Sequence, residues 1–192
     1  MSEELIVAQC SPTMAGLKTG TLFTCPKEDK KSLTESIRSI NQRFVCKGIR
    51  MIPVKIVKNR ILVYMYRPER LAKDLQEPTA VKILKSKNYP VEDCNRCVIE
   101  LVRRLNMDDV FPHEIGLFLG YPSEDVEGFI CNGAKNAKCV GTWKGYGDEN
   151  AANRNFEQLL CFNKNDYIVF FKAYIKLEVR YTASQSIFKI CP

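Results

Sequence analysis

The stretch 49–66 is the feature that most constrains the fold of this chain. Its first half alternates apolar side chains with others, and its second half is a continuous run of apolar and aromatic residues. Between the halves, Lys58 and Asn59 form a pair typical of a tight turn, because asparagine tolerates a positive φ. The pattern predicts a β-hairpin. Pro53 places its first strand at a sheet edge or a bulge, since proline cannot donate a ladder hydrogen bond.

Helical patterns lie on both sides of this hairpin. Apolar residues recur at helical spacing from Leu33 to Phe44, and Ser32 with Glu35 fits a capping box at the start of that helix. Residues 11–25 contain one proline and two glycines, so we expect a loop that leads into a short strand near 22–25. The sequence predicts covering helices at 32–46, 91–105, 112–131 and 148–161, and shorter helices at 68–75 and 78–87.

Together these elements predict a single α+β domain over residues 1–192. Its antiparallel sheet consists of the hairpin 49–66 and a further strand at 139–145, and helices cover the sheet. A chain of 192 residues, of which 45% are hydrophobic, is long enough to bury a real core. The alternating residues 171–181 indicate another strand, but we assign no function to the tail 162–192.

The cysteine content and the N-terminal sequence indicate a reducing compartment. The chain has nine cysteines, an odd number, and its N-terminal residues show no apolar segment typical of a secretory signal. The longest apolar run, 167–171, is far shorter than the about 20 residues that span a bilayer. We therefore expect a cytoplasmic protein with free thiols and no membrane contact, in a cell that rarely meets oxygen, because exposed thiolates oxidise.

The positive charge is concentrated in the N-terminal half. Residues 1–96 contain 18 Lys and Arg against 10 Asp and Glu, whereas residues 97–192 contain 11 against 12. Such a basic half could contact a nucleic acid or an acidic protein. The basic residues are scattered, however, and no nucleic-acid-binding motif accompanies them. A solvated surface is therefore the favoured interpretation, and nucleic-acid binding is an alternative.

Several motifs give the chain a resemblance to a known family. They are CSPTMAGLKTGTLF (10–23), KGIR (47–50), KNRILVYMYRPERL (58–71), FPHEIGLFLGYPSEDVEGFI (111–130) and CVGTWKGYGDE (139–149). In this order, over residues 9–160, they resemble the bacterial domain of unknown function family number 3793. The resemblance implies a small cytosolic protein of anaerobic bacteria, with a hint toward iron or redox physiology and no known activity. Relative to the family pattern, residues 162–192 form a divergent tail.

Cys10, His113 and Cys139 are the candidates for chemistry. A thiol enzyme would use Cys10 or Cys139 as its nucleophile and His113, the single histidine, as its base. The same three residues could instead hold one iron, because thiolates are soft ligands, but their long spacing makes the pattern unspecific. The competing interpretation is that His113 caps or packs a helix. We favour it, since nothing in the sequence brings a cysteine beside the histidine.

A second set of candidates could bind a ligand. The segment 143–148 places aromatic residues and glycines beside a lysine, an arrangement that can line a ligand groove. A strand, a turn and a helix cap are the simpler interpretation of the same residues. The candidate ligand-binding residues are Lys18, His113, Glu114, Trp143, Lys144 and Tyr146.

Because no catalytic motif is complete, the sequence favours a non-enzymatic binding or accessory protein over an enzyme. Its partner would be an unidentified protein or small molecule bound near His113 and 139–148, and iron is the one cofactor that the sequence suggests. This hypothesis depends on one spatial condition. The blocks 111–130 and 139–149 must fold back to share the wall of one pocket.

Overall fold

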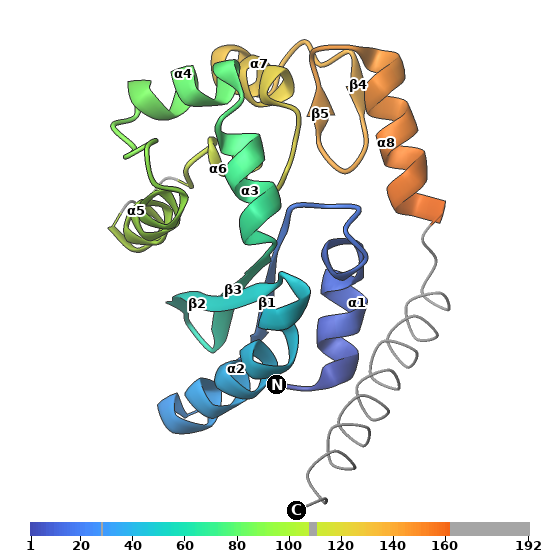
Figure 1. The fold of residues 1–192 in the computed structure, drawn as a ribbon. Coiled ribbons are helices and arrows are strands. Elements are labelled where there is room, and N and C mark those ends of the chain that lie inside the picture. Colours follow the sequence, from blue (N-terminus) through green and yellow to red (C-terminus); the bar gives the residue numbers. More distant parts are fainter. Residues whose placement is uncertain (28, 108–110, 162–192) are drawn as a thin grey trace, which may run out of the picture.

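A three-stranded antiparallel sheet lies at the centre of the molecule (Figure 1). The structure, a computed structural model, describes residues 1–27, 29–107 and 111–161. The strand order in the sheet is β1 (Gly20–Pro26), β3 (Arg60–Tyr66), β2 (Arg50–Val57). The hairpin β2–β3 confirms the prediction for 49–66, and β2 is an edge strand whose pairing shifts register just after Pro53. The strand predicted at 171–181 lies outside the described residues.

The central strand β3 separates two apolar cores, because its side chains alternate between the two sides of the sheet. Ile61, Val63 and Met65 point into a core that also contains apolar residues of α1 (Glu3–Met14) and α2 (Lys30–Phe44). A 3₁₀ turn, η1 (Val45–Lys47), follows α2. We call this side of the sheet the closed side, since its core residues are almost completely buried.

Tyr64 and Tyr66 point to the opposite side, where they stack with their ring centroids 4.7 Å apart. The Tyr64 hydroxyl donates to the Phe118 carbonyl oxygen at 2.5 Å, which ties the sheet to the helices above it. We call this side, including the elements beyond it, the aromatic side. Its helices are α3 (Pro68–Leu75), α4 (Pro78–Ser86), α5 (Cys94–Met107), α6 (Ile115–Phe118) and α7 (Ser123–Asn132).

The segment predicted as a strand at 139–145 does not join the central sheet. It forms a separate small hairpin of β4 (Cys139–Val140) and β5 (Lys144–Gly145), followed by α8 (Glu149–Cys161). The turn at Gly141, whose N–H donates to the Trp143 carbonyl oxygen at 2.9 Å, reverses the chain before a longer strand can form. The hairpin lies between α7 and α8 (Figure 1).

The N-terminal region differs from the prediction in two places. Residues 11–14 are the end of α1 and not a loop, because Ile6, Cys10 and Met14 form a buried face that packs against the sheet although Pro12 lies in the last turn. The helix α2 begins before the predicted capping box at Ser32. Asp29 caps it and accepts hydrogen bonds from the N–H groups of Lys31 and Ser32, both at 3.0 Å.

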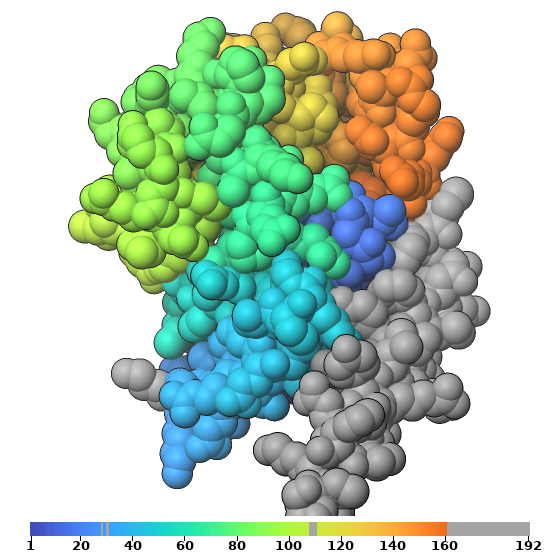
Figure 2. All heavy atoms as spheres, viewed as in Figure 1, coloured from blue at the N-terminus to red at the C-terminus, as the bar shows by residue number. Residues whose placement is uncertain are grey.

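The described part of the chain is a single α+β domain with helices packed around an antiparallel sheet, as the sequence predicts. In the space-filling view the residues coloured light blue to cyan lie below those coloured green, and a dark-blue N-terminal patch lies between the green and the orange residues (Figure 2). Among the described helices, none is long and apolar enough to cross a bilayer.

Candidate functional site

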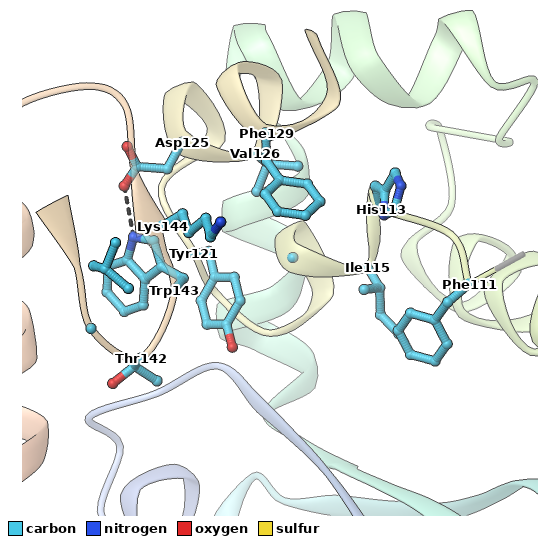
Figure 3. Close-up of a pocket in the computed structure, with 13 residues that line it drawn as sticks. Phe111, His113, Ile115, Tyr121, Asp125, Val126, Phe129, Thr142, Trp143 and Lys144 are labelled. Carbon is cyan, nitrogen blue, oxygen red and sulfur yellow. Dashed lines mark hydrogen bonds between the residues drawn. The ribbon is translucent and has the colours of Figure 1, made fainter. Parts of the chain in front are cut away.

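A cavity of about 410 Å³ lies at the outer edge of the aromatic side (Figure 3). Its walls come from the segment 111–129 and from the β4–β5 hairpin, which are the two blocks that the sequence hypothesis required to meet. The side chains and backbone that line it belong to Phe111, His113, Ile115, Gly116, Tyr121, Asp125, Val126, Phe129, Val140, Gly141, Thr142, Trp143 and Lys144. Phe111 and Val140 are more than half exposed, so the cavity has apolar side chains at its rim.

Aromatic rings form much of the wall. Tyr121 stacks on Trp143 with their centroids 4.9 Å apart and their planes 26° from parallel, and Trp143 meets Phe156 edge-on at 4.6 Å. Opposite them in Figure 3, His113 packs edge-on against Phe129 with centroids 5.1 Å apart. Flat rings that are fixed by their neighbours offer a rigid apolar surface to a ligand.

Asp125 holds the hairpin against α7. One carboxylate oxygen accepts from the Trp143 indole N–H at 2.7 Å, and the other accepts from the backbone N–H groups of Tyr146 at 2.6 Å and Gly147 at 2.8 Å. The residue is 4% exposed, and both of its oxygens are occupied. Asp125 therefore fixes the angle at which Trp143 enters the cavity wall and has no free oxygen to offer a ligand.

Glycine makes the same packing possible. A Cβ on Gly141 would lie 2.4 Å from the Phe156 ring, and a Cβ on Gly128 would lie 2.4 Å from Tyr146. Both distances are shorter than real Cβ contacts, so in each case an aromatic ring rests directly on backbone. The glycines of these two blocks allow α7, the hairpin and α8 to approach closely around the cavity.

Lys18 is not among the residues that line the cavity, but from the loop between α1 and β1 it reaches Tyr121, which does line it. Its ammonium lies over the Tyr121 ring, 5.1 Å from the centroid. Burial lowers the pKa of this lysine from 10.5 to about 8, and the neighbouring Cys10 opposes the shift only in part. No hydrogen bond or ion pair joins the ammonium to a residue that the structure describes.

The other ligand-binding candidates divide into two groups. His113, Trp143 and Lys144 line the cavity, and Lys144 donates one hydrogen bond to the Ala134 carbonyl oxygen at 2.7 Å. Glu114 and Tyr146 do not line it. The Glu114 carboxylate is buried in the neighbouring core, where it accepts from the Tyr89 hydroxyl at 3.1 Å, and the Tyr146 ring packs over Gly128.

The family model described as protein of unknown function (DUF3793) matches residues 6–178. The chain belongs to this DUF3793 family. The match includes part of the tail 162–192, which we expected to diverge. No curated protein and no solved structure matches the chain.

The three candidates for chemistry are not gathered into one centre in this DUF3793 protein. Cys10 is fully buried in the core of the closed side, and burial raises its pKa well above the ordinary value, so its thiol stays protonated at neutral pH. The Cys139 sulfur faces Gly145, and His113 packs on Phe129. Within residues 1–27, 29–107 and 111–161, no group of three or more His, Cys, Asp or Glu side chains is arranged to hold a metal ion.

Sequence reasoning did not single out four residues that shape this site: Tyr121, Asp125, Val126 and Phe129. All lie within the block 111–130 that carries the DUF3793 resemblance, so a signal for the region existed. By its position, Asp125 is one of two acids in the first turn of α7, which is a common place for an acid. Its bond to Trp143 is a tertiary contact, which spacing along the chain does not reveal.

Proposed function

We propose that this DUF3793 protein is a binding protein that takes a small molecule with a flat apolar part into the cavity between residues 111–129 and the β4–β5 hairpin. The observation that carries the proposal is the wall itself, in which the stacked rings of Tyr121 and Trp143 line a mostly apolar cavity. A volume of about 410 Å³ falls in the range of about 300–1,000 Å³ that is typical of small-molecule sites. A few polar groups, on His113, Thr142 and Lys144, would orient the ligand.

Two features favour binding over catalysis at this site. The carboxylate of Asp125 accepts three hydrogen bonds that hold the hairpin against α7, so its contacts assign it to the wall and not to proton transfer. Cys10 is held protonated in a closed core, away from the cavity lining. Thiol chemistry and nucleic-acid binding through the basic half stay predictions that no geometry supports.

We also propose that the protein works in a reducing cytoplasm and in an anaerobic bacterium. The support is that two of the cysteines with described side chains, Cys46 and Cys131, are exposed, which suits a compartment where thiols are not oxidised. The link to iron or redox metabolism stays a prediction based on the family resemblance.

The test uses N-phenyl-1-naphthylamine, an uncharged aromatic probe that fluoresces in apolar surroundings. Trp143 is the single tryptophan, so its emission reports on the site and can transfer energy to a bound probe. We expect saturable binding of one probe per chain. Thr142→Phe, which adds a ring to an exposed residue of the cavity lining, should weaken binding at least about tenfold, or about 1.4 kcal/mol.

Ile56→Phe is the matched control, because it adds a ring to an exposed strand residue outside the cavity lining. Its affinity for the probe should stay within about twofold of the unchanged protein. Equal loss of affinity in both variants, or no saturable binding at all, would refute the cavity as a ligand site.

A further inference from the structure

The charge near the cavity is unbalanced. Lys18 brings an ammonium to the edge of Tyr121, and Lys144 uses one of its three N–H donors on Ala134. The one carboxylate that lines the cavity, Asp125, keeps its negative charge, but both of its oxygens already accept hydrogen bonds from Trp143 and from the backbone of the hairpin. The described residues around the cavity therefore offer positive charge and donors without an available negative partner.

Lys18 is the residue for which this imbalance is greatest. Its side chain is only partly exposed, and no hydrogen bond or ion pair joins its ammonium to any residue in the described ranges. A partly buried ammonium without a counter-ion is unfavourable, because burial removes water without supplying an opposite charge. The lowered pKa of this lysine is the expected consequence.

The Lys18 ammonium lies next to the aromatic wall of the cavity. Its ammonium lies over the ring of Tyr121, and the same ring lines the cavity and stacks on Trp143. Figure 3 shows the loop between α1 and β1, which carries Lys18, passing below the Tyr121 hydroxyl. A lysine has a flexible four-carbon stem, so its ammonium can move from the ring to a charged group on a ligand that rests against that ring.

We infer that the cavity takes small aromatic anions, and that Lys18 is the residue that meets the ligand's negative charge. This inference rests on the proposed function and adds the chemical class of the ligand, an aromatic body with a carboxylate, sulfonate or phosphate group. A cationic ligand would meet repulsion from Lys18 and Lys144. A neutral ligand would leave the Lys18 ammonium without a counter-ion.

The test compares two probes with the same ring skeleton. 8-Anilinonaphthalene-1-sulfonate carries a sulfonate that N-phenyl-1-naphthylamine lacks. In the unchanged full-length chain, the sulfonate probe should bind more tightly than the neutral probe. Lys18→Met should weaken the sulfonate probe about tenfold and leave the neutral probe within about twofold, because only the charge-assisted contact is lost. Lys18→Arg, which keeps the charge, should retain most of the preference.

Lys85→Met is the control for net charge, since it removes an exposed lysine of α4 that does not line the cavity. It should change neither affinity. Equal affinities of the two probes, or an equal loss of both in Lys18→Met, would overturn the inference and leave the proposed function standing. Absence of saturable binding by both probes would overturn the proposed function and this inference together.

Discussion

The two sides of the central sheet are built from the same strands but differ in what they bury. On the closed side, α1 and α2 pack aliphatic residues, methionines, phenylalanines and two cysteines into a core whose members are at most 8% exposed. On the aromatic side, tyrosines of the sheet are followed by the Tyr121–Trp143 stack, Asp125 and a cavity of about 410 Å³. The closed side has a compact apolar core, whereas the aromatic side has a cavity at its outer edge.

The difference separates residues that stabilise the fold from residues that could act on a ligand. Cys10 is the first residue of one of the family motifs, but it belongs to the closed side, where burial keeps its thiol protonated and unreactive. Trp143 and Tyr121 belong to the aromatic side, where they lie at the edge of an equally buried core, are themselves only partly buried, and line the cavity. We expect changes on the closed side to alter stability without altering binding, and changes on the aromatic side to alter both.

The largest loss of stability should come from Phe23→Ala on the closed side. Phe23 is 3% exposed, and its truncation would leave a cavity in a tightly packed core. The free energy of unfolding should fall by about 3–5 kcal/mol, measured by urea denaturation. The affinity of the folded fraction for N-phenyl-1-naphthylamine should not change. A loss of affinity in folded Phe23→Ala protein would show that the two sides are coupled and would contradict the comparison.

A smaller loss of stability with a loss of binding should follow from Asp125→Ala. The change leaves the Trp143 indole N–H and two backbone N–H groups without their acceptor, and it should cost about 2–3 kcal/mol. The hairpin should separate from α7, so Trp143 emission should shift to the red and probe affinity should fall about tenfold or more. The control is Glu124→Ala, which replaces an exposed acid next to Asp125 in the same helix. It should change neither the Trp143 emission nor the affinity for the probe.

The central hairpin and the starts of the two short helices α3 and α4 were the parts that sequence could predict. The pattern along 49–66 predicted the β2–β3 hairpin, and Pro68 and Pro78 marked the starts of α3 and α4 as the structure has them. The end of α1 was missed because Pro12 and the following glycines are typical of a loop. The packing of the Ile6, Cys10 and Met14 face on the sheet, which is a tertiary effect, outweighs that local signal.

The candidate site was predictable only as a meeting of two blocks. His113, Trp143 and Lys144 were named from residue type and local pattern, and the structure places all three in one cavity wall. Glu114 and Tyr146 are sequence neighbours of lining residues, but the turn at α6 and the glycine at 128 direct their side chains elsewhere. The position of Lys18 over Tyr121 depends on the packing of the α1–β1 loop, for which no local pattern exists.

The smallest expected effect on stability is a gain, from Lys18→Met. A partly buried ammonium without a counter-ion among the described residues opposes folding, so its replacement by an apolar side chain of similar length should raise the free energy of unfolding at pH 7 by about 1–2 kcal/mol. This is less than the pKa difference alone would give, because part of the side chain reaches solvent. Urea denaturation of both proteins at several pH values provides the measurement.

The pH dependence of that gain identifies its cause. Below pH 8 the lysine is protonated in the folded and unfolded states, so the burial penalty is fully present. Between about pH 8 and 10.5 the folded protein releases the proton while the unfolded chain still holds it, so the difference between the two proteins should shrink. If the Lys18→Met protein is less stable than the unchanged one at pH 7, the ammonium stabilises the fold. The idea that burial of this charge destabilises the protein would then be wrong.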